Sequence, residues 1–348
     1  MLCHICPDLI VNDSTVVSYR LTNLKLPLDH DPSELRSEVL SILSLQDVDL
    51  LNLHVFRRGY DARKKSNIHF IYTVDLQFSA EVDISFLISK CHLQITPDME
   101  YKPVFSAIEG NSYTNTPGYK RPVVVGTGPC GLFAALTLAQ LGLRPLVIER
   151  GKAVRERTKD TWGFWRKQIF NQESNVQFGE GGAGTFSDGK LWTQAKDRRH
   201  LGRKVMEEMV KGGAPEEILY VSKPHVGTFR LVKIVEYLRS EIERLGGEIR
   251  FSSRVENIVV EAGGIRGLET LNMISGERSE IDANQVVLAV GHSARDTFEM
   301  FHRRGIYMEA KPFSIGFRIE HPQSLIDKAR LGPHAGNELI GAADYKLV

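Results

Sequence analysis

Alternation of hydrophobic and polar residues near the N-terminus predicts a small unit of strands and one helix. The segment VVSYRLTNLKL, which starts at Val16, alternates as a strand does. The segment DPSELRSEVLSILSL follows, with an aspartate at its N-cap and Pro32 in the first helical turn. Two more alternating segments, LLNLHVFRR and IHFIYTVDLQF, are separated by the polar loop GYDARKKSN. The pattern therefore predicts a β-α-β-β order.

That order is found in half of a ferredoxin-like module, so we expect residues 1–100 to form a small α+β domain. Phe70 and Tyr72 of its last strand are expected on opposite faces of the sheet, with acidic residues nearby. An RNA-binding sheet needs exposed aromatic residues flanked by basic ones, so this domain is not expected to bind RNA. Residues 101–120 are rich in Pro, Gly, Asn and Thr and lack periodicity, which predicts a linker.

A different pattern begins at about Arg121, where the strand PVVVG leads into GTGPCG, the helix PCGLFAALTLAQLG and a second strand, LRPLVIE. In this β-α-β context Gly126 permits the tight turn, Gly128 lets the backbone approach a pyrophosphate, and Gly131 lets the helix pack close to the sheet. Pro129 suits the first helical turn, and Cys130 follows it in the same helix. The amides at this helix start are expected to face phosphates.

Glu149 ends the second strand, 18 residues after Gly131. An acid at this position accepts hydrogen bonds from ribose hydroxyls and disfavours a cofactor with a 2′-phosphate. The segment therefore predicts a dinucleotide-binding site, but it does not distinguish NAD from FAD.

The downstream sequence favours FAD. A basic segment follows Glu149, in which Arg150 and Arg157 are candidate cofactor-binding residues and Arg157 is expected to pair with the pyrophosphate. The glycine-rich stretch NVQFGEGGAGTFSDGKLWT comes next. No strand precedes this stretch, so it is not a second nucleotide fingerprint. Glycines there allow the backbone to approach a bulky flat ligand, and we expect the residues after them to lie near the flavin. The candidate cofactor-binding residues of this stretch are Gly181, Gly182, Gly184, Thr185 and Lys190, the last as a cation beside the reduced flavin.

A β-meander follows, with the strands RVENIVVEA, GIRGLETLN and SEIDA, and then the buried strand QVVLAVG. Val255, which leads the meander, is expected to meet the adenine with its backbone. The last strand brings Gly291 and His292 to the same sheet edge as Gly126, and His292 is expected to donate a hydrogen bond to the cofactor or to backbone. This order of elements is the plan of two-domain flavoproteins.

The motifs FGEGGAGTFSDGKL, SKPHVGTFRLVKIVEYLR, LAVGHSARDTFEM and KPFSIGFRIEHPQ together resemble the FAD-utilising dehydrogenase family. The resemblance implies an α/β fold: a glutathione-reductase-type FAD-binding Rossmann domain with a β-meander, an inserted substrate region and the small N-terminal α+β domain. The FAD-binding domain is expected over residues 121–348, with 160–235 and 305–348 on the substrate side. Family members continue past the equivalent of Val348 to a last glycine turn at the flavin, so we expect the domain to be incomplete at its C-terminus.

The resemblance implies an FAD-dependent oxidoreductase that acts on a small molecule, without identifying that substrate. A flavin-dependent monooxygenase remains an alternative, and so does a non-catalytic nucleotide- or RNA-binding accessory protein. No second fingerprint is found, so NAD(P)H or another electron carrier is expected to bind only transiently. FAD brings the redox chemistry itself, and we therefore assign no catalytic residue.

Composition adds few constraints. Lys and Arg number 44 against 43 Asp and Glu, which gives no electrostatic reason to expect a nucleic acid or membrane partner. No apolar stretch approaches the roughly 20 residues of a membrane helix, and the N-terminus does not resemble a targeting signal, so we expect a cytoplasmic protein. Cys3 and Cys6 form a single CxxC pair without a second one, so no metal site is expected.

Overall fold

The computed structural model describes residues 17–345 except 188, 192, 194, 313, 314 and 318, and the chain divides into two units. The first unit runs to Asp98 and also takes in Tyr220–Ser222 and the residues from Phe317 onward. The second unit comprises Met99–Leu219 and Lys223–Gly316. The pair Cys3 and Cys6 lies outside the described residues. No helix of the described residues is long and apolar enough to cross a membrane.

Up to Asp98 the described part of the first unit has the four predicted elements and three more: η1 (Asp47–Asp49), α2 (Ile84–Cys91) and β4 (Gln94–Ile95). The four predicted elements are β1 (Tyr19–Pro27), α1 (Pro32–Leu43), β2 (Leu50–Asp61) and β3 (His69–Phe78). The strands form an antiparallel sheet in the order β2-β3-β1-β4. This is the complete β-α-β-β-α-β order of a ferredoxin-like module, not half of one.

Phe70 and Tyr72 lie on the same face of the sheet, which corrects the expectation of opposite faces. Both side chains are 5% exposed and their ring centroids are 6.0 Å apart. The physical reason is the two-residue period of a strand, which places residues i and i+2 on one face. That face packs into the core of the unit, so neither aromatic ring is presented to a nucleic acid.

Residues beyond Phe317 belong to the first unit and not to the FAD-binding domain, where the sequence placed them. Helix α9 (Gln323–Leu331) and the turn η4 (Gly332–His334) lie in this segment. Leu331 and Ala343 are buried in the same core cluster as β1 and β3, which explains the assignment. The expected linker also contains a helix, α3 (Ala107–Thr114). Ser106 and Glu109 form a capping box at its N-terminus.

The second unit is built on a parallel sheet in the order β11-β5-β6-β7. Its strands are β5 (Val123–Val125), β6 (Leu146–Ile148), β7 (Glu248–Arg250) and β11 (Val286–Leu288). The predicted meander is confirmed as β8 (Ser253–Glu261), β9 (Gly264–Asn272) and β10 (Arg278–Asp282). The remaining elements are α4 (Pro129–Gln140), α5 (Val154–Lys167), η2 (Ala183–Phe186), α6 (Leu201–Lys211), η3 (Glu216–Leu219), α7 (Thr228–Arg244) and α8 (Arg295–Arg303).

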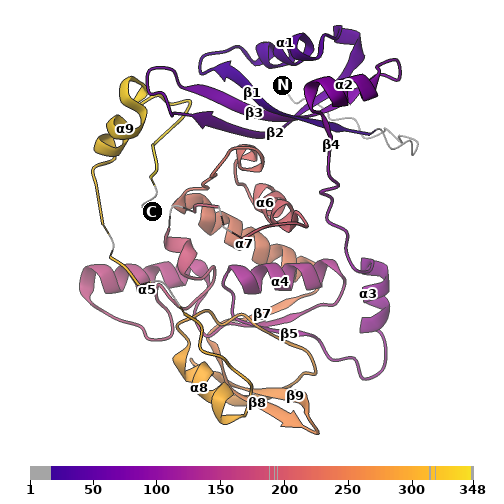
Figure 1. The fold of residues 1–348 in the computed structure, drawn as a ribbon. Helices are drawn as coiled ribbons and strands as arrows, with labels where there is room; N and C mark the ends of the chain where they lie inside the picture. The colour runs from indigo at the N-terminus through magenta and orange to yellow at the C-terminus, as the bar shows by residue number, and fades with distance from the viewer. Residues whose placement is uncertain are drawn as a thin grey trace, which may run out of the picture. The chain divides into compact units, whose positions relative to one another are not determined.

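Two apolar layers cover the two faces of this sheet. Val124 points into a cluster shared with α4 and α7, whereas Val123 and Val125 point into a cluster shared with the meander and α8. Figure 1 shows α4 and α7 on one side of the sheet and β8, β9 and α8 on the other. Strand β5 is therefore buried on both faces, as its uninterrupted valines predict. The predicted α/β class is confirmed, and the site is formed by the segments after the carboxyl ends of β5, β6 and β11.

Candidate dinucleotide-binding site

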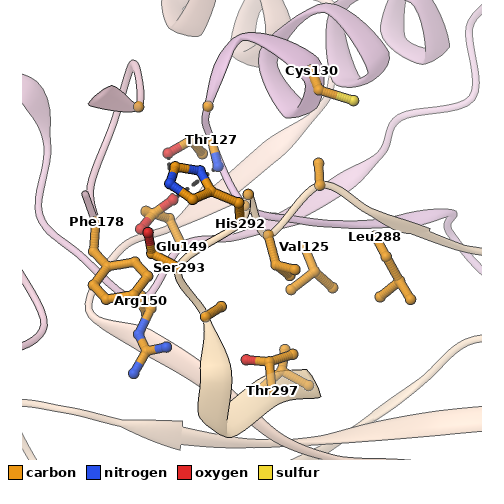
Figure 2. Close-up of a pocket in the computed structure, with 18 of the residues that line it drawn as sticks. Val125, Thr127, Cys130, Glu149, Arg150, Phe178, Leu288, His292, Ser293 and Thr297 are labelled. Carbon is orange, nitrogen blue, oxygen red and sulfur yellow. Dashed lines mark hydrogen bonds between the residues drawn. The ribbon is translucent and has the colours of Figure 1, made fainter. Parts of the chain in front are cut away.

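A cavity of about 590 Å³ lies at the carboxyl ends of β5, β6 and β11. Ligands of parallel α/β sheets bind at this edge, and the volume falls within the roughly 300–1,000 Å³ of small-molecule sites. Figure 2 shows side chains from several of these segments turned toward the same space. The lining comprises residues 125–130, 148–150, 177–179, 182–183, 253–255, 288–294, 297–298, 301 and 306–308.

The three fingerprint glycines have different surroundings. Gly126 has φ +102°, and a Cβ there would lie 2.4 Å from the Ala289 carbonyl oxygen. A Cβ on Gly131 would lie 1.8 Å from the Gly126 carbonyl oxygen, so this position allows α4 to pack against β5. A Cβ on Gly128 would meet nothing nearer than the Gly182 Cα at 3.9 Å. Only Gly128 leaves open space, and that space belongs to the cavity.

The N-terminus of α4 supplies hydrogen-bond donors to the cavity. Gly128 is the N-cap and no side chain caps the helix, while Pro129, the first helical residue, has no N–H to satisfy. The next amides, of Cys130 and Gly131, have no acceptor within the helix, and the helix dipole is positive at this end. Open space next to Gly128 and these amides together suit the phosphates of a dinucleotide.

Glu149 is 5% exposed and ties the fingerprint turn to the end of β6. Its Oε2 accepts hydrogen bonds from the Thr127 amide at 2.8 Å and the Thr127 hydroxyl at 2.7 Å (Figure 2). Its Oε1 accepts from the Gly151 amide at 2.7 Å. A carboxylate has about four acceptor positions, so three donors leave Oε1 able to accept one more. The residue therefore stabilises the turn and still lines the cavity with one acceptor for a ribose hydroxyl.

The predicted glycine-rich stretch forms a loop, residues 175–187, which we call the glycine loop. The Gly181 amide donates to the Thr127 carbonyl at 2.8 Å. A Cβ on Gly182, which has φ +65°, would lie 3.1 Å from the Gly128 Cα. Gln177 accepts a hydrogen bond from the Ser293 hydroxyl at 3.1 Å, which joins the loop to the turn after β11. The loop thus closes one side of the cavity against both turns.

Arg157 does not face the cavity, and the expectation that it binds the cofactor is corrected. It is 0% exposed and donates to four backbone carbonyls of the glycine loop. Its Nε donates to Asn175 at 2.8 Å, its Nη2 to Val176 at 2.7 Å, and its Nη1 to Glu180 at 2.6 Å and Gly182 at 2.9 Å. Burial lowers the pKa of this guanidinium to about 10.

Glu180 lies in the same loop and is also fully buried. Its Oε2 accepts from the Val154 amide at 2.7 Å, at the start of α5, and from Arg239 Nη1 of α7 at 3.0 Å. Among the described residues its Oε1 has no hydrogen-bond partner. Burial raises the pKa of Glu180 to about 7, against the opposing effects of the Val154 amide and Arg239.

Arg150 and its aromatic neighbour Phe178 both line the cavity. Its guanidinium carbon lies 4.3 Å from the centroid of that ring. Its Nε contacts Glu173 at 2.7 Å, and its Nη2 contacts Asp296 of α8 at 2.9 Å. These contacts hold the guanidinium in place at a cavity wall that also includes Arg254 and Val255.

The remaining predicted residues fall into two groups. Pro129, Cys130, Val255, Gly291 and His292 also line the cavity. The cavity lining does not include Gly131, Gly181, Gly184, Thr185 or Lys190. Thr185 is buried beside Arg157, and Lys190 forms an isolated β-bridge with His225. The roles of Lys190 and His292 toward a flavin stay predictions.

Several lining residues were not predicted. Thr127 and Phe178 lie inside the two glycine motifs, whose pattern indicates a role only for the glycines. The wall from α8 was also missed: Thr297, Phe298 and Phe301. Ile306, Tyr307 and Met308, which extend this wall, lie in the segment 305–348 that was predicted on the substrate side but were not named. The amphipathic pattern of ARDTFEMF, directly after the last strand, was the available signal.

Comparison with known proteins agrees with this geometry. Residues 120–305 match the model for pyridine nucleotide-disulphide oxidoreductases, and residues 312–348 match one described as FAD-dependent protein, C-terminal domain-like. Residues 18–77 match a domain of unknown function. An uncharacterized protein of Clostridium beijerinckii is 42% identical over 331 residues, which cover 95% of this chain and 59% of that protein. The chain thus spans about three-fifths of the length of that relative.

Solved structures also align with part of the chain. Thermovibrio ammonificans THI4 is 19% identical with a TM-score of 0.35, and the match covers 57% of this chain and 65% of that one. A 3-ketosteroid-Δ4-(5α)-dehydrogenase from Rhodococcus jostii RHA1 is 15% identical with a TM-score of 0.32, and covers 51% and 47%. The family model, however, spans more than half of the chain and includes the whole fingerprint, the glycine loop and the meander. The protein therefore belongs to the pyridine nucleotide-disulphide oxidoreductase family, and with it to the FAD-utilising oxidoreductases that its motifs resemble.

Proposed function

We propose that the protein is an FAD-dependent dehydrogenase that oxidises a small organic molecule. One observation carries this proposal: the fingerprint turn, Glu149, the glycine loop and the turn at Gly291 meet around a single cavity. Each of these parts has the chemistry that one portion of a flavin dinucleotide needs.

The residues present fit such a cofactor. The pyrophosphate would lie in the open space at Gly128 and accept hydrogen bonds from the amides of Cys130 and Gly131. A side chain at position 128 would fill that space, which explains the glycine there. Glu149 would accept a ribose hydroxyl with its remaining acceptor position. The backbone at Val255 would meet the adenine, next to the wall that Arg150 and Phe178 form.

When bound, FAD would supply the chemistry of hydride acceptance and of electron transfer to a second carrier. The protein's own part is to bind, orient and exclude water. Phe298, Phe301 and Ile306 give the cavity an apolar wall that keeps water from the cofactor and strengthens polar contacts within the site. Lys190, which is exposed just after the glycine loop and lies outside the cavity lining, is the residue we propose would place a positive charge beside the flavin end of the cofactor.

Dehydrogenation is proposed in preference to oxygen insertion, because the four motifs together resemble the FAD-utilising dehydrogenase family. The substrate is proposed to be a small molecule, and NAD(P)H or another carrier is proposed to exchange electrons with the flavin transiently. A flavin-dependent monooxygenase is the alternative, which a substrate screen distinguishes.

The first experiment is a visible absorption spectrum of the purified protein before and after incubation with FAD and desalting. Flavin bands that remain with the protein, and FAD identified in the denatured supernatant, support the proposal. FMN and NAD are the matched controls, because each contains only part of the proposed ligand. Retention of NAD but not FAD, or of no cofactor at all, would contradict it.

Candidate substrates are then screened for bleaching of the bound flavin without oxygen. Bleaching by the substrate alone, without consumption of oxygen, indicates a dehydrogenase. Substrate-dependent oxygen uptake with a hydroxylated product would indicate a monooxygenase instead.

A further inference from the structure

The glycine loop is held from behind by two buried charged side chains, Arg157 and Glu180, which we call the loop clamp. Both side chains are fully buried. Arg157 comes from α5, and Glu180 belongs to the loop itself. Neither lines the cavity.

Arg157 binds the loop at its start and again near its middle. Its Nε and Nη2 bind the carbonyls of Asn175 and Val176, where the loop begins, and its Nη1 binds those of Glu180 and Gly182. The planar guanidinium has five N–H groups in a fixed fork, and four carbonyls at 2.6 to 2.9 Å use most of them. The start of the loop and its middle are thereby held at a fixed distance from each other.

The residues between these anchors face the other way, into the cavity. Gln177, Phe178 and Gly179 line it, and so does Gly182, whose carbonyl is one of the anchors. Gly179, with φ +119°, packs directly on the clamp, since a Cβ there would lie 2.4 Å from the Arg157 Cδ. The wall of the cavity therefore rests on the aliphatic stem of Arg157 as well as on its hydrogen bonds.

Glu180 fixes the same loop to two helices. Its carboxylate accepts from the first amide of α5 and forms an ion pair with Arg239 of α7 at 3.0 Å. A carboxylate is favourable at a helix N-terminus, and the ion pair offsets part of the cost of burying it. Its backbone amide also donates to the Lys152 carbonyl at 3.1 Å, before α5 begins.

The loop that is held in this way lies against the phosphate-binding turn. Gly181 is hydrogen-bonded to Thr127, and the Gly182 backbone approaches Gly128, which borders the open space. A shift of the loop by about one ångström would alter that space, and misplacement on this scale has large effects on binding and catalysis.

We propose that Arg157 and Glu180 are positioning residues of the dinucleotide site: they touch no cofactor, but set the distance between the glycine loop and the phosphate-binding turn. This inference rests on the proposed function. Arg157 is the stronger determinant, because it alone binds four carbonyls of the loop, two at its start and two near its middle.

The test compares R157K with R155K. Lysine keeps the charge at position 157 but offers its donors from a single nitrogen, which cannot reach both pairs of carbonyls. Arg155 lies on the same helix, 70% exposed, and pairs with Glu236, so R155K makes the same change outside the clamp. E180Q is the second variant, because it keeps an oxygen for the Val154 amide and removes only the charge.

Two readouts are measured for each variant: amide hydrogen exchange of the glycine loop without cofactor, and the dissociation constant for FAD. In R157K we expect exchange over residues 175–182 to rise at least tenfold relative to the sheet strands. FAD binding should weaken tenfold to a hundredfold, the range seen when groups that orient metal ligands are removed. E180Q should show smaller changes in the same direction, and R155K none.

The outcomes separate this inference from the proposed function. If the wild-type protein binds no FAD, the proposed function fails, and a loosened loop in R157K would still establish the clamp. If the wild type binds FAD, and R157K loosens the loop while affinity stays within twofold, the positioning role is overturned. Uniformly faster exchange throughout the second unit in R157K would also overturn it, because Arg157 would then be a general stabiliser. Should R157K not fold, E180Q against wild type decides by the same two readouts.

Discussion

The fingerprint glycines give the sharpest test, because the structure separates those needed for folding from the one needed for binding. G131A would place a Cβ 1.8 Å from the Gly126 carbonyl oxygen, a distance that real Cβ atoms do not reach. Helix α4 must move by on the order of 1 Å, and overpacking of this kind costs about 3 kcal/mol. G128A meets no atom closer than 3.9 Å and keeps an ordinary φ of −66°, so its cost should be below about 1 kcal/mol.

Thermal unfolding followed by circular dichroism measures the first effect, and titration with FAD measures the second. At about 2–4 °C per kcal/mol for a unit of this size, G131A should lower the Tm by about 6–12 °C and G128A by less than about 4 °C. A methyl group in the phosphate space should remove at least one charge-assisted hydrogen bond, so G128A should weaken FAD binding about tenfold to a hundredfold. FAD affinity equal to wild type in G128A would refute the placement of the phosphates. A loss of stability as large as that of G131A would refute the packing argument.

Three further predictions concern single side chains. Cys130 is exposed in the cavity, so free FAD at ten times its Kd should slow alkylation of this thiol about tenfold, as mass spectrometry of the labelled peptide can show, while Cys91 in the other unit keeps its rate. Burial raises the pKa of Glu180 from 4.5 to about 7, so the folded protein binds this proton more tightly than the unfolded chain does. About 3 kcal/mol of the free energy of unfolding should therefore be lost as the pH rises from 4.5 to about 7. Urea unfolding of E180Q should not show this loss. E149Q should destabilise the second unit by about 1–3 kcal/mol in urea unfolding, because three donors face the carboxylate and an amide side chain has only one oxygen to accept them; an unchanged unfolding midpoint would contradict this.

Much of the second unit was predictable because its signals are local. The turn after β5 and the acid at the end of β6 lie within one β-α-β unit, whose spacing directly reflects helix and strand geometry. The meander strands follow from alternation and from glycine turns between them. These features depend on residues close in the sequence, so a pattern can reveal them.

The errors arose where distant residues decide the structure. Helix α9 looks like any short amphipathic segment, and only the burial of Leu331 in the N-terminal core assigns it to the first unit. Helix α2 and strand β4 are short, so their periodicity is weak, and pairing with β1 is what establishes β4. The apolar wall from α8 likewise depends on how that helix packs under β8.

Arg157 illustrates the limit most clearly, because its charge suggested a phosphate ligand. An arginine that binds phosphate and one that binds carbonyls look the same in a sequence, since both follow a dinucleotide fingerprint and precede a glycine-rich loop. The difference is the direction of the side chain: one turn of α5 puts Arg157 and Thr161 on the buried face and leaves Arg155 outside. The glycines then have a second explanation, because Gly179 must be small to accommodate the arginine stem and not to admit a ligand. A glycine-rich loop beside a basic helix therefore predicts an arginine that supports a rigid loop as readily as an arginine that binds the cofactor. Amide exchange of the loop in R157K without cofactor distinguishes these roles, because only loss of the supporting role should speed up that exchange.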